Sequence, residues 1–349
     1  MRCFARFLPL LFWGLPGSLS AQPVSHAPLR AVRQCAACHP AQSNPHPQTS
    51  MAHALELTSE CAILKSHPAL SFRNGSYSYR IERQGDRSIY SVSDGQQTIT
   101  VPLRWAFGLG SAGQTYVYEK DGELYQSRVS YYREINGLDF TLGAPNVKPA
   151  NLTQAAGQLM DHDEKVQCFR CHATNAVEGR ELTLDKLIPG VQCERCHGSS
   201  DHHLEGIQKG DAKLARMKDL RALNSEETSN FCGQCHRTWE EIAASGHLGV
   251  LNVRFQPYRL TNSKCYDADD KRIRCTACHN PHEEINRVDT SYDGKCLACH
   301  GGKPSARACK TATGNCVSCH MPKIEISGSH HGFTDHEIRI VRANAPYPD

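Results

Sequence analysis

Residues 275–300 read CTACHNPHEEINRVDTSYDGKCLACH and contain the five-residue pattern Cys-x-x-Cys-His twice. The pattern recurs five more times along the chain, and its cysteine pairs account for fourteen of the eighteen cysteines. A chain of this composition would produce the pattern by chance roughly 0.05 times. Seven copies therefore mark one repeated chemical site. In chain order they are Cys35-Cys38-His39, Cys168-Cys171-His172, Cys193-Cys196-His197, Cys232-Cys235-His236, Cys275-Cys278-His279, Cys296-Cys299-His300 and Cys316-Cys319-His320.

The spacing of this motif has a chemical reason. Two thiols three positions apart on a helical turn can each add to a vinyl group of the same porphyrin, and the next histidine then lies beneath the iron. The motifs thus predict seven covalently attached c-type haems, with the motif histidines as proximal iron ligands. Zinc ribbons and thioredoxin-like redox pairs also use Cys-x-x-Cys, but neither requires a histidine after every pair.

The composition predicts what these haems do for the fold. Aromatic residues make up 7% of the chain and its mean hydropathy is −0.51, which is lean for a chain expected to bury a core. Porphyrins packed against one another would supply the missing apolar volume, so haem attachment should be coupled to folding. We expect a mainly α fold with much irregular structure, organised around stacked c-type haems, with a small β-rich insertion.

Histidine is the expected sixth ligand of most irons. The nineteen histidines less the seven in motifs leave twelve, against four methionines after residue 21. Paired histidines imply low-spin haems of lower potential than His/Met cytochromes, although each spare histidine could instead lie at the surface or support another ligand. Met321 directly follows His320, so it is poorly placed to reach the far face of that haem and is interpreted as packing. The candidate distal ligands are His53, His162, His202, His203, His247, His282, His330, His331 and His336.

Four cysteines lie outside the motifs. Cys3 falls within the leader segment described below. Cys265 and Cys309 each precede a motif by about ten residues or fewer, and we expect them to form a disulfide in an oxidising compartment. Cys61 is interpreted as a small buried hydrophobe, and the alternative is a free thiol with a redox role.

The first residues predict export. Arg2 and Arg6 precede an apolar run from Phe7 to Leu15 and small residues up to Ala21, as in a secretory signal peptide. Neither this run nor any later one is long enough to span a bilayer, so we expect a periplasmic protein, or alternatively an extracellular or cell-surface one. The 39 Lys plus Arg and 36 Asp plus Glu leave a charge of +3 without a basic stripe, which argues against nucleic acid as a partner.

A stretch without cysteine or histidine separates the first motif from the second. It contains strand-like alternations at 77–81 and 115–118, with Asp94-Gly95 and Asp121-Gly122 as hairpin turns. This insertion is either a docking or substrate-restricting surface, or a packing cap over exposed haem edges. The expected organisation is a signal peptide at 1–21, an N-terminal segment with the first haem at 22–65, the β-rich insertion at 66–145, a six-haem domain at 146–342 and a tail at 343–349.

Several longer elements extend the motifs. They are Cys-Ala-Ala-Cys-His-Pro at 35–40, Arg-Phe-Gln-Pro-Tyr-Arg-Leu at 254–260, Cys-Thr-Ala-Cys-His-Asn-Pro-His at 275–282, Cys-Val-Ser-Cys-His-Met-Pro-Lys at 316–323 and Phe-Thr-Asp-His at 333–336. Through them the chain resembles the multihaem cytochrome superfamily of hydroxylamine oxidoreductase and pentahaem nitrite reductase, and in particular its tetrahaem electron-acceptor branch. The resemblance implies closely packed haem pairs, alternately parallel and perpendicular. Seven haems match none of these members, and the lysine that replaces the proximal histidine in the nitrite reductases is absent from the motifs.

Three functions are compatible with these features. The first is an electron carrier between respiratory redox proteins, which the surplus of histidines favours because an iron closed on both sides can only exchange electrons. The second is an oxidoreductase that acts on a small nitrogen or sulfur oxyanion at one open haem, with nearby charged or protic side chains. The third is a subunit whose β-rich insertion docks to a larger respiratory or outer-membrane complex.

Overall fold

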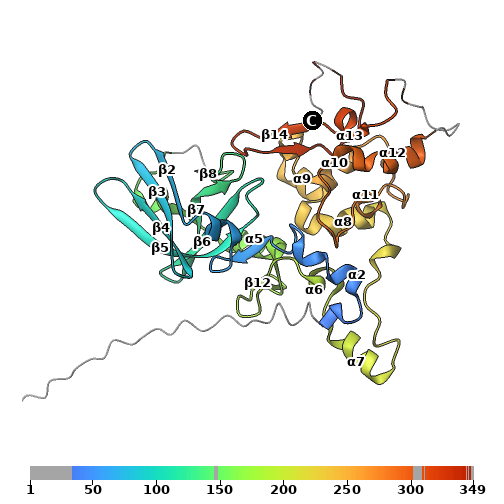
Figure 1. Ribbon diagram of the computed structural model, residues 1–349, viewed down its shortest axis with the longest axis horizontal. Helices are drawn as coiled ribbons and strands as arrows, with labels where there is room; N and C mark the ends of the chain where they lie inside the picture. Colours follow the sequence, from blue (N-terminus) through green and yellow to red (C-terminus); the bar gives the residue numbers. More distant parts are fainter. Residues whose placement is uncertain are drawn as a thin grey trace, which may run out of the picture.

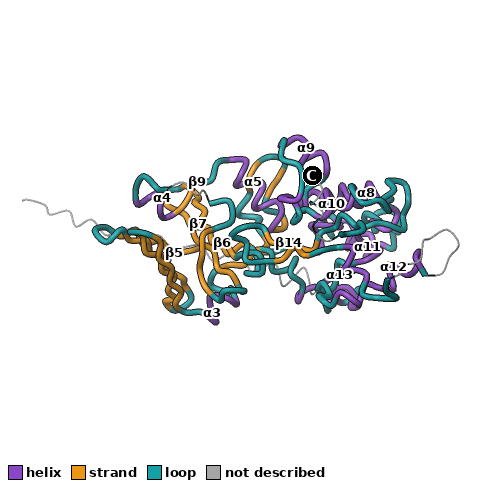
Figure 2. The backbone as a smooth tube through the Cα atoms, turned by 90° about the horizontal axis from the view of Figure 1, so that it is seen from above, coloured by secondary structure: helices purple, strands orange, loops and turns teal. Residues whose placement is uncertain are grey.

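The computed structural model describes residues 34–144, 148–301, 309, 311–342, 344 and 346. The predicted signal peptide at 1–21 lies outside the described residues, as do His26 and most of the predicted tail at 343–349. Figure 1 shows a sheet of long strands beside a region of short helices and loops. Figure 2 shows the same two parts from above, with the strands in orange and the helices in purple.

One antiparallel sheet contains nine strands. From β2 to β8, strands that are consecutive in the chain are neighbours in the sheet, while β1 pairs with β5 and β9 pairs with β7. The sheet reaches beyond the predicted insertion at 66–145 because these two short strands join it. Its strands are β1 (Leu55–Leu57), β2 (Ala69–Asn74), β3 (Tyr77–Gln84), β4 (Arg87–Ser93), β5 (Thr98–Phe107), β6 (Gln114–Lys120), β7 (Glu123–Tyr132), β8 (Gly137–Phe140) and β9 (Gly157–Leu159).

Asp-Gly pairs form two of the hairpin turns. Asp121 (φ 53°) and Gly122 (φ 81°) both have left-handed backbone conformations between β6 and β7, as a tight primed turn requires. Gly95 (φ 92°) lies between β4 and β5. The sheet curls so that β2 and β8, at the two ends of its strand order, come together. The rings of Phe72 in β2 and Phe140 in β8 are 5.3 Å apart.

The sheet encloses most of the apolar core. Every second residue along β3 and β4 points inward. Tyr79 of β3 and Tyr90 of β4 are therefore buried and belong to the same hydrophobic cluster. A second cluster joins the sheet to helix α5 (His162–His172), where the Phe169 ring lies 5.1 Å from the rings of both Trp105 and Phe107. The sheet is therefore fixed to the helix that carries the second motif.

Short helices carry the motifs. Asp161 and Glu164 form a capping box at the start of α5, and Asn224 and Glu227 form another at the start of α8. The motifs end or fill helices, except that α2 follows the first one. Besides α5, the helices are α2 (Pro40–Ser43), α3 (Ala62–Ser66), α4 (Leu152–Ala156), α6 (Cys193–His197), α7 (Asp201–Lys209), α8 (Ser225–His236), α9 (Trp239–Ser245), α10 (Gln256–Thr261), α11 (Cys275–Cys278), α12 (Asp293–His300) and α13 (Cys316–His320).

Minor elements complete the helical region. They are the strands β10 (Ala173–Thr174), β11 (Val177–Glu178), β12 (Glu181–Leu182), β13 (Ile188–Pro189), β14 (Lys323–Glu325) and β15 (Gly332–Thr334), and the 3₁₀ turns η1 (His46–Gln48), η2 (Leu220–Ala222), η3 (Val250–Asn252) and η4 (Asp289–Tyr292). Together with the nine-stranded sheet, these elements give the described chain more strand than a mainly α fold contains.

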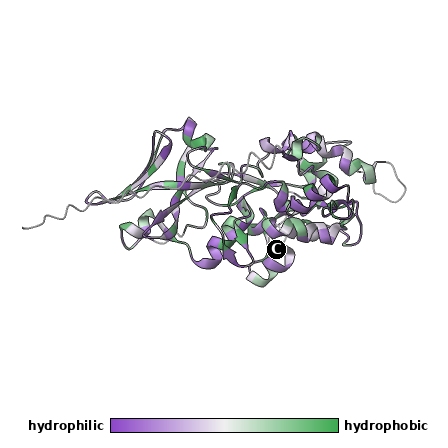
Figure 3. Ribbon diagram, turned by 90° about the horizontal axis from the view of Figure 1, so that it is seen from below, coloured by the Kyte–Doolittle hydropathy of each residue, from purple (hydrophilic) through white to green (hydrophobic). Residues whose placement is uncertain are grey.

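The helical region has few buried apolar side chains of its own. Among the described residues after Cys193 these are Ile242, Val253, Tyr258, Leu260, Val317 and Ile324. Figure 3 shows hydrophobic and hydrophilic segments interspersed there. A protein region of this length normally buries many more apolar side chains. Another component must therefore fill the interior of the helical region. None of the helices in the described ranges is both long and apolar enough to cross a membrane.

Candidate haem-binding cavity

One cavity of about 4170 Å³ occupies the helical region, and cysteines and the histidine of every motif line it. A pocket for one drug-sized ligand measures about 300–1,000 Å³, so this space can hold several large groups. It accounts for the sparse apolar core, because the side chains that would normally pack against one another line this cavity instead. The residues present therefore fit the prediction that the cofactors share one core.

Each motif adopts a helical turn. The His39 amide donates to the Cys35 carbonyl at 2.8 Å, and the His279 amide donates to the Cys275 carbonyl at 2.9 Å. In a helical turn, residues i, i+3 and i+4 lie on one face, so the two thiols and the histidine of each motif point to the same side. The local geometry is the one that attachment of a porphyrin through two thioethers requires.

Contacts between cysteine side chains show which motifs are neighbours. Arg195 of the third motif donates to the Cys235 sulfur of the fourth at 3.8 Å. The His279 ring of the fifth motif lies 5.4 Å from the ring of Tyr292, which directly precedes the helix of the sixth motif. The thiols of four further pairs lie close enough to shift each other's pKa, namely Cys35 and Cys193, Cys171 and Cys235, Cys232 and Cys275, and Cys296 and Cys316. The motifs thus form a row in the order one, three, four, five, six, seven, and the second motif joins the row at the fourth.

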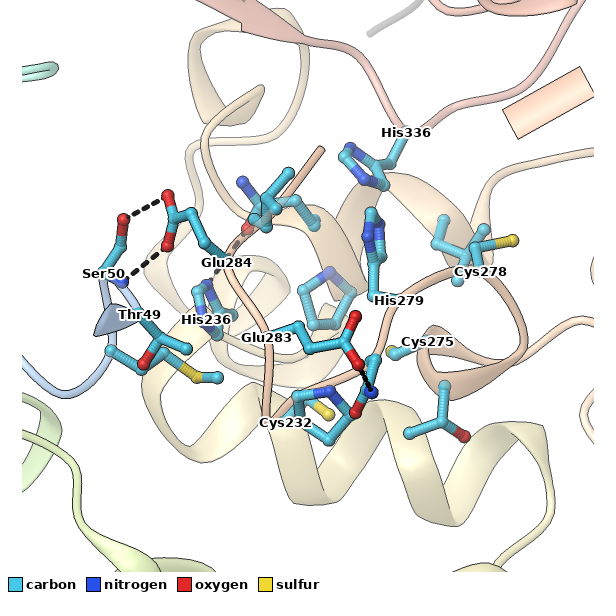
Figure 4. Close-up of a pocket in the computed structure, with 18 of the residues that line it drawn as sticks. Thr49, Ser50, Cys232, His236, Cys275, Cys278, His279, Glu283, Glu284 and His336 are labelled. Carbon is cyan, nitrogen blue, oxygen red and sulfur yellow. Dashed lines mark hydrogen bonds between the residues drawn. The ribbon is translucent and has the colours of Figure 1, made fainter. Parts of the chain in front are cut away.

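Three motif histidines face histidines from elsewhere in the chain. The ring centres are 6.3 Å apart for His39 and His203, 6.2 Å for His197 and His282, and 6.2 Å for His279 and His336. An iron bound by two imidazoles holds their centres about 6 Å apart, since metal–nitrogen bonds are about 2 Å long. Figure 4 shows the His279 and His336 rings facing each other. The spacing therefore fits one iron between the members of each pair.

Hydrogen bonds at Nδ1 orient several of these rings. Nδ1 of His336 donates to the Thr334 carbonyl at 2.9 Å, and Nδ1 of His320 donates to the Arg339 carbonyl at 2.8 Å. His172 and His203 make the same kind of bond to the carbonyls of Ala54 and Ala215. A proton held at Nδ1 leaves the lone pair of Nε2 free, which is the usual arrangement of a histidine that binds a metal.

Burial favours the neutral form of four histidines of these pairs. It lowers the pKa of His279, and it lowers the pKa of His336 to about 4. Burial also lowers the pKa of His197 and of His282. A neutral imidazole is the form that binds iron, so the environment favours ligation at neutral pH.

The structure places four of the nine candidate distal ligands in the cavity, namely His203, His282, His331 and His336. The other five do not line it. His53 uses both ring nitrogens in hydrogen bonds, to Glu56 at 2.9 Å and to the Pro47 carbonyl at 2.8 Å. Its neighbour Glu56 raises the pKa of His53 through the first of these bonds. This histidine therefore has no free nitrogen for a metal.

The remaining four candidates are displaced for different reasons. Nε2 of His330 bonds to Asp139 of β8 at 2.8 Å, so this residue ties the helical region to the sheet. His162 and His202 are exposed on helices α5 and α7. His247 is exposed too and bonds to the Ser245 carbonyl through Nδ1. We therefore assign none of these residues to an iron.

His46, which is not among the nine predicted distal ligands, also lines the cavity. It is buried, and its Nδ1 has no hydrogen-bond partner within the described residues. Burial and nearby His282 both lower the pKa of His46. Its context offered one signal, because Asn44-Pro45-His46 repeats the tripeptide of Asn280-Pro281-His282. Next to these residues, the amide and hydroxyl of Ser50 both donate to Glu284, as Figure 4 shows.

The cysteines outside the motifs do not form the predicted disulfide. Cys265 and Cys309 are both free, and Cys309 is exposed. Cys265 lies instead near Cys296 and Cys299 of the sixth motif, where it lines the haem cavity. Cys61 is buried inside the sheet, its thiol donates to the Gln114 side chain at 3.3 Å, and burial raises the pKa of this thiol to about 11. These features suit the interpretation of Cys61 as an inert core residue.

A buried ion pair supports the third histidine pair. The side chains of Arg259 and Asp335 are both fully buried, and two hydrogen bonds of 2.9 and 3.0 Å join them. Asp335 precedes His336 directly, and it also binds Arg339, whose carbonyl orients His320. The network thus holds ring positions at the fifth and seventh motifs.

Comparison with known proteins agrees with these features. Residues 143–198 match the family model described as "Cytochrome c554 and c-prime". The chain is 23% identical to the multiheme cytochrome MtrA of Shewanella baltica over 49% of this chain and 47% of that protein. It is 25% identical to the high-molecular-weight cytochrome c of Nitratidesulfovibrio vulgaris over 44% of this chain and 34% of that protein. It is 22% identical to the dissimilatory sulfite reductase MccA of Wolinella succinogenes over 35% of this chain and 23% of that protein.

A solved structure shares the fold. The crystal structure of outer cell wall cytochrome OcwA superposes with a TM-score of 0.51 and 12% sequence identity, over 88% of this chain and 79% of that one. The chain spans about half or less of the length of the curated relatives named above. Seven Cys-x-x-Cys-His motifs around one cavity agree with these matches, which are to multihaem c-type cytochromes.

Proposed function

We propose that this protein is an exported electron carrier that holds seven c-type haems and passes electrons between redox proteins. The observation that carries the proposal is the row of neighbouring motifs from the first to the seventh. Haems attached at contacting motifs lie close together, and the haems supply the one-electron chemistry. The protein's own role is to space them and to keep solvent from most of their surface.

Ligation supports a carrier. We assign His39 with His203, His197 with His282, and His279 with His336 as axial pairs, because their ring spacing suits one iron. An iron closed on both sides exchanges electrons without binding a substrate. His172, His236, His300 and His320 are the proposed proximal ligands of the other four haems, with His46 and His331 as the distal ligands available to two of them.

The row has a branch that suits exchange with more than two partners. The second motif meets the fourth through Cys171 and Cys235, and its helix α5 packs against the sheet. An electron at the fourth haem therefore has routes toward the first, second and seventh. We propose that a redox partner docks near the sheet, in keeping with an assembly in the periplasm or at the cell surface. The resemblance to the tetrahaem electron-acceptor branch supports a respiratory role.

Coulometric titration of the loaded protein tests this proposal. If all haems are in electronic contact, reduction should take up seven electrons per chain, and one external mediator should equilibrate them all. Reduction by fewer than six electrons, or a set of haems that reduces only after unfolding, would show that no continuous conduit exists.

A second candidate function is an oxidoreductase that acts on a small nitrogen or sulfur oxyanion at one open iron. Five described histidines outside the motifs line the cavity, and adding the undescribed His26 gives six for seven irons. Histidine alone therefore leaves at least one sixth position without a ligand. The guanidinium groups of Arg237 and Arg254 lie 5.2 and 4.8 Å from the ring of Phe255, and no carboxylate pairs with either in the described ranges. Two such cations favour an anion nearby.

Spin state separates the two functions. Electron paramagnetic resonance of the oxidised protein should show only low-spin iron for a pure carrier. A high-spin signal that changes on addition of sulfite or nitrite would favour the oxidoreductase, and the match to a protein named as a sulfite reductase makes sulfite the first oxyanion to try.

A further inference from the structure

A second, smaller cavity of about 270 Å³ lies among α8, α9 and α10. Glu226, Ser229 and Asn230 of α8 line it, whereas Thr228, Phe231 and Cys232 of the same helix line the haem cavity. Residues three and four positions apart share one face of a helix, so the two sets occupy opposite faces of α8. The smaller cavity is thus separated from the haems by the thickness of this helix.

Two hydroxyl groups at this cavity have no hydrogen-bond partner within the described residues. They are Oγ of Ser229, a residue that is only 3% exposed, and the hydroxyl of Tyr266. The two hydroxyls lie beside each other, but neither makes a bond of normal geometry. A buried hydroxyl without a partner costs about 1–3 kcal/mol, so such groups usually meet a ligand or ordered water.

The rim of this cavity is negatively charged. Glu226 and Glu240 both line it, and neither forms an ion pair with a cationic side chain in the part of the chain that the structure describes. Burial raises the pKa of Tyr266, and the negative charges of Glu226 and Glu240 raise it further. Both carboxylates therefore lie close enough to the Tyr266 hydroxyl to influence it electrostatically.

One wall is aromatic. Trp239, the first residue of α9, lines the cavity and is 42% exposed, which leaves part of its ring open to a ligand. The side chains of Asn230 and Asn262 complete the lining with polar groups. A planar cation can stack on an indole while it donates hydrogen bonds to carboxylates, and the guanidinium group combines both properties.

We propose that this cavity binds a guanidinium group, with Trp239 as its stacking surface and Glu226 and Glu240 as its counter-ions. The Ser229 and Tyr266 hydroxyls would accept hydrogen bonds from it. The group could belong to an arginine side chain of a partner protein or to a free guanidino compound, because both present the same chemistry. The inference concerns a site outside the haem cavity and does not depend on what the haems do.

Calorimetric titration of the haem-loaded protein with methylguanidinium tests the site. Methylurea is the matched neutral control, because it has nearly the same shape without the charge. Methylguanidinium also has no basic lone pair at neutral pH, so it does not bind to haem iron. We expect one site per chain for methylguanidinium, weaker binding at higher salt, and no measurable binding of methylurea. Equal binding of the two compounds, or no binding of methylguanidinium at millimolar concentration, would overturn the proposal.

Variants locate the binding. Combining Glu226→Gln with Glu240→Gln should weaken the affinity at least about 10-fold, as expected when a cation loses two charged partners. Glu60→Gln removes the same charge from an exposed residue of the N-terminal segment and should leave the affinity unchanged. An unchanged haem spectrum shows that each variant folds. If the double variant binds as the parent does, the site is elsewhere and the proposal fails.

A blocked peptide that contains one arginine between apolar residues distinguishes the sources. If it binds about 10-fold more tightly than methylguanidinium, the site is a docking point for a protein partner. If the affinities are equal, the site recognises the guanidinium group alone, as expected for a free compound. A peptide that does not compete with methylguanidinium would contradict a docking role for the site.

Discussion

Arg259 and Asp335 are 76 positions apart in the chain, and both are fully buried where two hydrogen bonds join them. Each belongs to one of the longer sequence elements, at 254–260 and 333–336. The pair explains why these elements occur together, since one supplies the cation and the other supplies both its counter-ion and His336. The contact fixes a proposed iron ligand without touching the iron.

Removing one member of this pair should destabilise the protein. Arg259→Gln leaves Asp335 buried without its main partner, which typically costs about 3–5 kcal/mol. Denaturant unfolding of the loaded protein measures the change. Arg221→Gln is the matched control, because Arg221 pairs with Asp219 at the exposed surface. If both variants lose the same stability, the buried pair does not hold the fifth motif in place.

Stability should depend on pH through His336. Burial alone lowers the pKa of this histidine to about 4 from an ordinary 6.5, and binding to the proposed iron would oppose protonation further. Between these values the unfolded chain binds a proton that the folded chain excludes, so stability falls as pH falls from about 6.5 to about 4. Unfolding measured across this range should show the decline, and His336→Met should reduce it. His202→Gln changes an exposed histidine and should leave the profile as it is.

The potential of the fourth haem should respond to Gln256. The side chain of Gln256 bonds to Nδ1 of His236 at 3.1 Å, and such a bond increases the basicity of an iron ligand. Gln256→Leu should therefore raise the reduction potential of one haem, because the oxidised iron loses stabilisation. A spectroscopic redox titration should show one shifted component among seven. If none shifts, His236 is not an iron ligand or this bond does not form.

Alkylation should distinguish the cysteines outside the motifs. Backbone hydrogen bonds from Thr311 and Ala312 lower the pKa of the exposed Cys309, whereas burial raises that of Cys61 to about 11. Iodoacetamide at pH 8 should thus label Cys309 in the folded protein and leave Cys61 unmodified. Peptide mass spectrometry reads out both positions. An unlabelled Cys309 joined to Cys265 would restore the disulfide that the structure lacks.

Short-range signals predicted more than long-range ones. The motif spacing located the haem-attachment turns, and Asp121-Gly122 located a hairpin, because both depend on a few adjacent residues. The partners of the motif histidines could not be predicted in this way. His203 faces His39 across a distant stretch of chain, and nothing near His203 distinguishes it from the exposed His202 beside it.

Local contacts decide where two further histidines point. His53 was a reasonable ligand by position, but Glu56 lies three residues later and binds its ring. His46 lines the cavity and shares its Asn-Pro-His context with His282. Whether a histidine turns toward an iron depends on which other acceptors its nitrogens meet, and these are fixed only when the chain folds around the cofactors.

The intact mass of the haem-loaded protein shows directly whether seven haems are attached around the cavity. Seven haems should add roughly 4 kDa to the mature polypeptide, and the pyridine haemochrome assay should give seven haems per chain. Mutation of Cys316 and Cys319 to serine should lower the count by one. A mass that corresponds to five or fewer haems in the parent protein would contradict the account.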